Sequence, residues 1–434
     1  MAEHAPAPKQ TEAWKVLAAS LVGSSIEWYD FFLYGTVSSL VFSKVFFPGF
    51  DPATGLLYSY ATFAVPFFVR PLGGVIFSHI GDRSGRKNTL IATLSLMGAA
   101  TFLIGVLPGY DTLGFMAPLL LVLLRMVQGL GIGGEWGGAL LLAVEYAPPR
   151  RRGLYGSVPQ MGVTIGMLMG TLSMSLMTSL PEEDFMSWGW RVPFVLSIVL
   201  VALGLAIRRG IGETPAFREA RSAGRIARVP LFETVRHEWR SVLVAVGAKV
   251  VETAPFYIFS TFILSYGTVT LGFSKASVLN SVSAATLVGT LLIVPMGRLS
   301  DTVGRRKVYV AGTWGLVLYP FAYFFLLSRQ SVPLLYLATI LGLGVLWAPV
   351  TAVLGTLFSE IFRTRVRYTG VTIGYQLGAA LAGGTAPFIA TALLQGSGGS
   401  PAPIAVYMML TGLISLLAVQ WKPGATEDNS VNAP

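Results

Sequence analysis

The sequence predicts an all-α integral membrane protein with about twelve spanning helices, arranged as two halves of about six. Three observations carry this prediction: the composition, the recurrence of long apolar runs and the placement of basic residues. Of the 434 residues, 53% are hydrophobic and only 12% are charged, whereas soluble domains carry about 25% charged residues. Most of the chain is therefore expected to lie in lipid.

Apolar runs recur about twelve times along the chain and are broken by polar or Gly/Pro-containing turns. A helix needs roughly 20 predominantly apolar residues to cross the hydrocarbon core, and most of the runs reach or approach that length. The predicted spans lie at residues 16–41, 57–79, 88–107, 117–146, 154–179, 190–209, 241–266, 277–297, 308–328, 333–358, 369–394 and 403–421.

Basic residues lie mainly in the loops on one side of the predicted bundle. With the N-terminus inside, the inner loops hold clusters such as Arg150 to Arg152, whereas the outer loops hold only Lys44, Arg191, Lys275 and Arg329. Because cytoplasmic loops carry an excess of Lys and Arg, both termini are predicted to be cytoplasmic. The net charge of +10 is thus spread over short loops and does not indicate nucleic-acid binding.

A long polar segment divides the chain into two halves. It mixes arginines with glutamates and is predicted to form either a solvated linker or a basic surface segment that binds anionic lipid. The predicted organisation is a cytoplasmic N-terminal segment (1–15), an N-terminal six-helix half (16–207), the linker (208–240), a C-terminal six-helix half (241–421) and a cytoplasmic tail (422–434).

The first apolar run contains two carboxylates, Glu27 and Asp30, on one face of the predicted helix, with Tyr34 one turn further along. A carboxylate near the middle of the membrane costs several kcal/mol unless it faces a polar interior or takes up a proton. We predict that the pair lines a pathway and holds one exchangeable proton, with Asp30 as the carrier. Glu135 and Glu252 are the next candidates. Packing against neighbouring helices is the alternative role for the pair.

Three basic residues lie inside predicted spans and away from their ends: Arg70, Arg125 and Lys249. They predict an anionic substrate, a small mono- or dicarboxylate, because a guanidinium matches a carboxylate in bidentate geometry. Arg125 shares a helix face with Gln128, and Lys249 shares one with Glu252. Two structural roles stay open: Arg70 could neutralise a carboxylate of the first span, and Lys249 could form a plain ion pair with Glu252.

Polar and aromatic residues fill out the predicted cavity between the halves. The set comprises Trp28, Tyr29, Tyr34, Gln160, Tyr257, Trp347, Tyr375 and Gln376. Because aromatic residues in membrane helices more often pack or anchor at the interface, only Tyr34, Gln160, Tyr257 and Gln376 are retained as substrate-binding candidates.

Motifs of enzyme and metal chemistry are missing from the sequence. It has no cysteine and three histidines, which excludes disulfides and thiolate sites and leaves no predicted metal centre. Neither H-E-x-x-H nor G-x-S-x-G occurs, so we expect no enzyme activity and no cofactor. The run from Gly129 to Gly134 matches G-x-G-x-x-G but lies inside a predicted span, where small residues let helices pack tightly.

The two halves echo each other in sequence. GDRSGRK (81–87) follows the second span, SDTVGRRK (300–307) follows the eighth, and Glu145 before a basic cluster is matched by Glu360. A parallel duplication of this kind places the binding site between the halves. The loops are predicted to form a cytoplasmic gate, with an aspartate capping a helix N-terminus, or else to bind lipid headgroups. The gating candidates are Asp82, Arg83, Arg86, Glu145, Asp301 and Arg305.

These duplicated loops carry the pattern G-x-x-x-D-x-x-G-R-[RK], which resembles the major facilitator superfamily. The second copy runs from Gly297 to Arg306, and the first has Ser78 in place of the opening glycine. Three further stretches resemble the metabolite:proton symporter family within it: EWYDFFLYG (27–35), the run 125–153, and GETPAF (212–217).

The resemblance implies the major facilitator fold and the symport of a small osmolyte or organic acid, such as shikimate, 2-oxoglutarate or proline betaine, with a proton. We therefore expect import of a shikimate- or 2-oxoglutarate-like carboxylate across the bacterial inner membrane by a monomer, with protons and membrane lipid as the other partners. Symport of a zwitterionic osmolyte and proton-independent uniport are the alternatives.

Overall fold

The computed structural model describes residues 10–84, 86–133, 140, 143–144, 147–210, 236, 238–362 and 367–421, and all regular structure in these ranges is helical. Nine helices there are long and apolar enough to cross a membrane, and two further apolar helices are shorter. The first helix, α1 (Gln10–Leu40), has 31 residues. Together these helices confirm the prediction of an all-α membrane protein with about twelve spans.

The long helices of the N-terminal half are α1, α3 (Pro52–Ser84), α4 (Arg86–Val106), α6 (Met116–Ile132), α8 (Arg152–Met177) and α10 (Val192–Gly210). Short elements connect them: α2 (Phe42–Phe46), α5 (Tyr110–Leu113), η1 (Pro149–Arg151), α9 (Glu182–Ser187) and η2 (Gly189–Arg191).

The C-terminal half begins with a span built from α13 (Trp239–Tyr257), η3 (Ile258–Phe262), α14 (Ile263–Ser265) and η4 (Tyr266–Thr270). The helices α15 (Lys275–Val303) and α16 (Arg305–Leu327) follow. Two more composite spans are α17 (Val332–Thr339) with η5 (Ile340–Leu346) and α18 (Trp347–Ile361), and α19 (Arg367–Ala379) with η6 (Ala380–Gly384) and α20 (Ala386–Gly396). The last helix is α21 (Ala402–Gln420).

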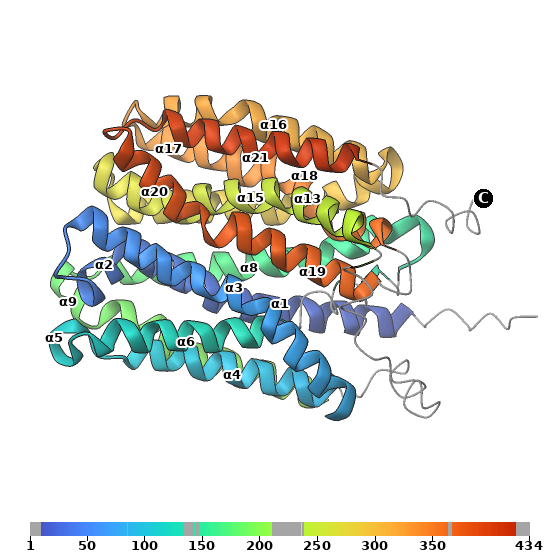
Figure 1. Cartoon of the computed structure of the whole chain (residues 1–434), viewed down its shortest axis with the longest axis horizontal. Coiled ribbons are helices and arrows are strands. Elements are labelled where there is room, and N and C mark those ends of the chain that lie inside the picture. Colours follow the sequence, from blue (N-terminus) through green and yellow to red (C-terminus); the bar gives the residue numbers. More distant parts are fainter. Residues whose placement is uncertain are drawn as a thin grey trace, which may run out of the picture.

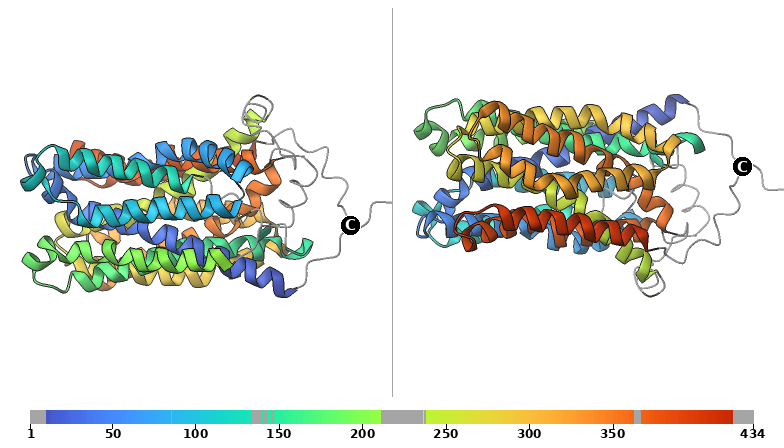
Figure 2. Two further views of the ribbon diagram at one scale, coloured as in Figure 1. Left: turned by 90° about the horizontal axis from the view of Figure 1, so that it is seen from below. Right: turned by 90° about the horizontal axis from the view of Figure 1, so that it is seen from above.

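The long helices run side by side along one axis, with the N-terminal half in the lower part of Figure 1 and the C-terminal half in the upper part. The start of α1 and the end of α21 lie at the same end of the bundle (Figures 1 and 2), as an even number of crossings requires. We call this the terminal end and the opposite one the far end. The loop charges predict that the terminal end faces the cytoplasm.

Helix α8 joins the two halves, since it packs against α1 of its own half and α15 of the other. Glycine makes the first of these contacts possible. A Cβ atom at Gly166 would come within 2.4 Å of the Ser25 carbonyl oxygen and 2.7 Å of the Tyr29 nitrogen, so the backbones of α8 and α1 touch directly.

Three spans of the C-terminal half change into π-helical geometry, at η3 and η4, at η5 and at η6. Such turns break the regular hydrogen-bond ladder and are frequent at functional sites. One carbonyl in η3 is used by the other half, because Ser39 Oγ of α1 donates to the Thr261 oxygen at 3.0 Å.

Candidate functional site

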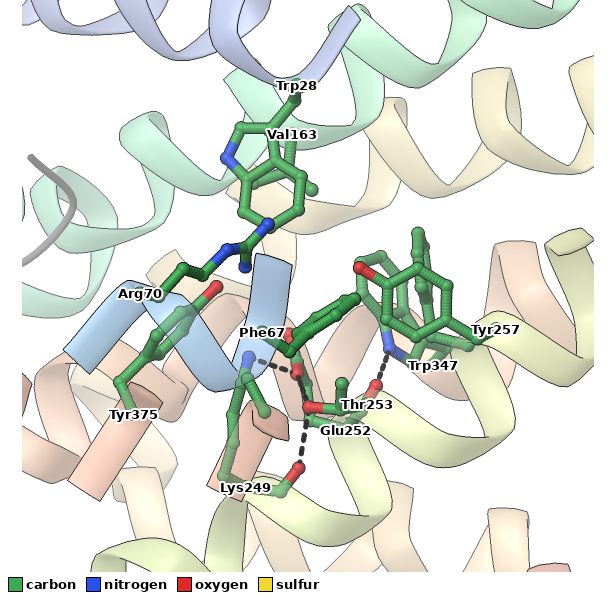
Figure 3. Close-up of a pocket in the computed structure, with 12 residues that line it drawn as sticks. Trp28, Phe67, Arg70, Val163, Lys249, Glu252, Thr253, Tyr257, Trp347 and Tyr375 are labelled. Carbon is green, nitrogen blue, oxygen red and sulfur yellow. Dashed lines mark hydrogen bonds and ion pairs between the residues drawn. The ribbon is translucent and has the colours of Figure 1, made fainter. Parts of the chain in front are cut away.

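A cavity lies between the two halves (Figure 3). The free space inside it is small, about 20 Å³, roughly enough for one water molecule, so its walls must move apart to admit a metabolite. The N-terminal wall consists of Trp28, Phe67, Arg70 and Val163, from α1, α3 and α8. The C-terminal wall consists of Lys249, Glu252, Thr253, Phe256, Tyr257, Trp347, Tyr375 and Ala379, from α13, α18 and α19.

Arg70 is the basic residue of the N-terminal wall, and it is 1% exposed. Its guanidinium carbon lies 5.6, 4.6 and 4.4 Å from the ring centres of Trp28, Phe31 and Phe67. Nε and Nη2 of Arg70 and Nε1 of Trp28 are buried and have no hydrogen-bond partner within the described part of the chain. Buried donors without an acceptor favour a ligand that supplies one, and a carboxylate can accept two parallel N–H bonds from one guanidinium.

Lys249 of the C-terminal wall forms an ion pair with Glu252, one turn along α13 (Figure 3). Glu252 also accepts hydrogen bonds from the hydroxyls of Thr253 (2.8 Å) and Thr351 (3.1 Å). The indole nitrogen of Trp347 donates to the backbone oxygen of Glu252 at 2.6 Å. The intrahelical pair that the spacing allowed is therefore present, and it faces the cavity.

Two glutamines connect the halves beside the cavity without lining it. The amide nitrogen of Gln160 in α8 donates to the carbonyl and hydroxyl oxygens of Thr351 in α18, at 3.2 Å each. Through Thr351 this bond reaches Glu252. The amide nitrogen of Gln376 in α19 donates to the Gly133 oxygen beyond α6 at 3.3 Å.

A second polar group, which we call the Asp30 cluster, lies inside the N-terminal half and comprises Asp30, Thr101, Gln128 and Arg125. Asp30 is 1% exposed. Its Oδ2 accepts from Thr101 at 3.0 Å, and its Oδ1 has no partner among the residues described. Thr101 accepts from Gln128 at 2.7 Å, and Gln128 accepts from Arg125 at 2.7 Å. A carboxylate at one end is thus joined to a guanidinium at the other.

Arg125 is held by the backbone of α3. Its Nε and Nη2 donate to the carbonyls of Thr62 (3.5 Å) and Phe63 (3.2 Å), and its guanidinium carbon lies 3.7 Å from the Tyr34 ring centre. Pro66 lies inside α3 and lacks the N–H that would bond to the Thr62 oxygen, which leaves that oxygen available. In the described ranges, no carboxylate lies within ion-pair distance of Arg125.

Known proteins resemble this chain over almost its whole length. The profile of the family described as "Sugar (and other) transporter" matches residues 15–228. The "Shikimate transporter" of Escherichia coli K12 is 40% identical over 413 residues, 94% of each chain. The "Inner membrane metabolite transport protein YhjE" of the same strain is 42% identical over 415 residues, 93% of each chain. The chain belongs to the metabolite:H+ symporter family of the major facilitator superfamily.

Two further likenesses place the transporter within this superfamily. The "Proline/betaine transporter" of E. coli K12 is 34% identical and covers 97% of this chain and 84% of its own length. The E. coli xylose transporter XylE, in a partially occluded inward-open conformation, is 16% identical, with a TM-score of 0.74 over 98% of this chain and 100% of its own. The fold is therefore the major facilitator fold, and the protein is a transporter and not an enzyme.

In transporters of this fold the two halves rock about a central site, so contacts between the halves at the two ends bear on the mechanism. At the terminal end, Asp301 of α15 accepts hydrogen bonds from the backbone nitrogens of Gly153 (2.7 Å) and Leu154 (3.0 Å) at the start of α8. A carboxylate of one half thus caps a helix of the other, where negative charge is favoured. Arg305 pairs with Asp301 at 3.5 Å and also with Glu360.

At the far end, different contacts bridge the halves. Lys275 at the start of α15 pairs with Glu182 of α9 at 2.6 Å. The hydroxyl of Ser175 in α8 donates to Asn280 Oδ1 in α15, also at 2.6 Å. In this conformation the two halves are therefore joined at both ends of the bundle.

The predicted site residues fall into separate groups. The cavity brings together Arg70, Lys249, Glu252 and Tyr257. Asp30, Arg125 and Gln128 form the Asp30 cluster, beside which the Tyr34 hydroxyl shares a 2.5 Å hydrogen bond with Thr62. Glu27 is buried but does not line the cavity. Outside the described residues lie Glu135, Glu145, residues 211–235 of the predicted linker, and the side chains of Asp82, Arg83 and Arg86.

Several cavity residues were not among the predicted binding candidates. The sequence predicts a packing or anchoring role for Trp28, Trp347 and Tyr375, but all three line the cavity. Phe67, Val163, Thr253, Phe256 and Ala379 also line it. Trp28 had a sequence signal, since it stands between the two carboxylates of the first span. The apolar members had none, because they look like any other residue of a membrane helix.

Proposed function

We propose that the transporter imports a small organic acid together with a proton across the bacterial inner membrane. The observation that carries the proposal is Arg70, a buried guanidinium facing the cavity with two nitrogens that lack acceptors in the part of the chain described. A relative that is 40% identical to this chain is named for shikimate, which carries one carboxylate. Both cavity walls come from one chain, so a monomer suffices.

Asp30 supplies the proton site in this proposal. An ionised carboxylate buried without a counter-ion costs several kcal/mol, and within the described residues Asp30 has a threonine hydroxyl as its hydrogen-bond partner and no cation at ion-pair distance. Glu252, in contrast, is ion-paired and accepts two further hydrogen bonds. We therefore assign the exchangeable proton to Asp30 and leave Glu252 ionised.

The Asp30 cluster offers a physical link between this proton and the substrate. When Asp30 ionises, it attracts the guanidinium of Arg125, to which it is joined through the cluster. Arg125 in turn holds the carbonyls of Thr62 and Phe63 in α3, about two turns before Arg70 on the same helix. Loss of the proton thus pulls on the helix that carries the substrate-binding arginine.

In the proposed transport cycle, the contacts at the two ends of the bundle break and form in turn. With the far end open, Asp30 loads a proton from the more acidic outside and the anion binds Arg70. The far-end contacts then close, the Asp301 cap on α8 releases, and the cavity opens towards the cytoplasm. The proton leaves and the substrate follows, because each ligand favours the state in which its partner is already bound.

Uptake by proteoliposomes containing the purified transporter tests the proposal. An inward proton gradient should drive accumulation of shikimate or 2-oxoglutarate above the external concentration, and collapse of the gradient with a protonophore should abolish it. Accumulation that survives the protonophore would identify a uniporter or a different driving ion. No uptake of either acid would remove the organic-acid assignment.

A zwitterionic osmolyte is the second candidate, favoured by the 34% identical relative named for proline and betaine. Its carboxylate would use Arg70 as well, so glycine betaine belongs in the same uptake panel. Preference for glycine betaine over both acids would make osmolyte symport the function.

A further inference from the structure

The three charged residues that line the cavity have a distribution that bears on the kind of acid it accepts. Arg70 stands on the N-terminal wall, while Lys249 and Glu252 stand together on the C-terminal wall. Building on the proposed function, we propose that the Lys249–Glu252 pair makes the C-terminal wall neutral and thereby selects monocarboxylates with uncharged polar groups over dicarboxylates and zwitterions.

The pair is fixed in place and does not offer a spare charge. Lys249 is 2% exposed, pairs with Glu252, and lies with its Nζ 3.7 Å from the Tyr375 ring centre. Glu252 is held by Thr253 and by Thr351. Figure 3 shows Lys249, Glu252 and Thr253 joined by hydrogen bonds on the wall opposite Trp28. Neither charge can turn to a ligand without leaving its partner buried and unpaired.

Arg70, on the other wall, has donors for one carboxylate. Its Nε and Nη2 and the indole nitrogen of Trp28 lack acceptors among the described residues. A bidentate carboxylate fills the arginine positions. A second carboxylate on the same small molecule would face Glu252 and the four aromatic residues of the C-terminal wall, and a cationic group would face Lys249.

Uncharged hydroxyl groups suit the C-terminal wall best. A ligand hydroxyl can donate to the Glu252 carboxylate, whose two oxygens have room for more hydrogen bonds than the three they accept. The wall also carries the hydroxyls of Tyr257 and Tyr375. The class that fits is therefore a small hydroxylated monocarboxylate.

The test removes one charge of the Lys249–Glu252 pair at a time and measures which ligand then binds most tightly. Binding of shikimate, 2-oxoglutarate and glycine betaine is measured by calorimetry on the purified full chain and on three variants. Glu252→Gln leaves Lys249 uncompensated and should tighten 2-oxoglutarate by about tenfold or more. Lys249→Gln leaves Glu252 uncompensated and should favour glycine betaine. The double variant Lys249→Gln/Glu252→Gln has a neutral wall again and should restore the order of the unmodified protein, with shikimate tightest.

Two results would overturn the inference: equal binding of 2-oxoglutarate and shikimate by the unmodified protein, or a ligand order unchanged in both single variants. Proton-driven uptake of both acids at equal affinity would leave the proposed function standing while this inference falls. Failure of every acid to bind the unmodified protein would remove both. If a single variant does not fold, the double variant is compared with the unmodified protein. A double variant that binds 2-oxoglutarate more tightly than shikimate would contradict the inference that a neutral wall selects monocarboxylates.

Discussion

Thr101 is placed to serve both protonation states of Asp30. Its Oγ lies 3.0 Å from Asp30 Oδ2, 3.0 Å from the Met97 oxygen and 2.7 Å from the Gln128 amide nitrogen. The single hydroxyl proton can point to an ionised Asp30. When Asp30 carries a proton, that proton can point to Thr101, and the threonine can donate to Met97 instead. One rotation of this hydroxyl thus keeps Asp30 Oδ2 hydrogen-bonded in both states.

The first prediction at the residue scale concerns Asp30→Asn, which mimics the protonated form. Accumulation driven by a pH gradient should be lost, while exchange of internal for external substrate, which needs no proton release, should continue. Counterflow and gradient-driven uptake in the same proteoliposomes measure the two. Glu27→Gln is the matched control one turn away. Full accumulation in both variants would move the coupling site to Glu252 or Glu135.

The second prediction separates two arginines by the same substitution. Arg70→Lys keeps the charge but loses the planar fork that faces the cavity, so substrate affinity should fall by about tenfold or more. Arg125→Lys loses the bonds to Gln128 and to α3, so turnover should fall while affinity changes little. Binding calorimetry and initial uptake rates separate the effects. A larger loss of affinity in Arg125→Lys would place that residue in the substrate site.

At the scale of one element, the start of α8 is where the C-terminal half contacts the N-terminal half at the terminal end. Its first turn receives the Asp301 carboxylate from the other half, and it tolerates no side chain there. A Cβ atom at Gly153 would lie 2.4 Å from Ser300 Oγ and 2.5 Å from the Gly297 oxygen. The helix N-terminus and the close packing therefore act on one surface, which must separate when the terminal end opens.

The third prediction follows from that cap. Asp301→Asn removes a charge worth about 0.3–2 kcal/mol at a helix N-terminus, so the population should shift towards the state open at the terminal end while substrate affinity stays nearly unchanged. Because the protein has no cysteine, Val163→Cys in the cavity wall reports access of a thiol reagent from the cytoplasmic side. Weaker binding with unchanged labelling would mean that Asp301 acts on the site and not on the gate.

For the whole molecule, contacts between the halves at the far end complement those at the terminal end. The Ser175–Asn280 and Lys275–Glu182 contacts lie at the far end, and the Asp301 cap lies at the other. Alternating access requires that one set breaks while the other holds, because a state with both sets broken would leave a continuous pore.

The fourth prediction uses the far-end contact as a lock. In the double variant Ser175→Cys/Asn280→Cys, oxidation or a short bifunctional thiol reagent should block uptake, because the far end cannot open. Reduction should restore uptake in the oxidised sample. Either single variant treated identically is the control. Undiminished transport after complete cross-linking would show that α8 and α15 do not separate at this level.

Sequence reasoning reached the span count, the halves and the buried charged residues, because length, loop charge and the cost of charge in lipid leave strong patterns. It did not assign side chains to the cavity. Trp347 and Tyr375 are aromatic residues of membrane helices, which pack or anchor more often than they bind a ligand, so their residue type did not identify them as cavity residues. The π-helical segments were also unpredicted, since their geometry depends on contacts such as that of Ser39 with Thr261.

Among the described residues no cation pairs with Asp30, and this bears on how membrane voltage acts on transport. In the proposed cycle the empty carrier returns with Arg70 positive and Asp30 ionised, so these two charges cancel. The loaded carrier crosses with the anion on Arg70 and a proton on Asp30, so the binding groups and their cargo again have no net charge. Membrane voltage would then do no work on uptake, and a one-unit pH gradient alone would set an accumulation of about tenfold. Liposomes clamped at different potassium diffusion potentials with valinomycin, at fixed pH gradient, should therefore take up the acid at the same rate, and a voltage-dependent rate would mean that more than one proton crosses with each anion.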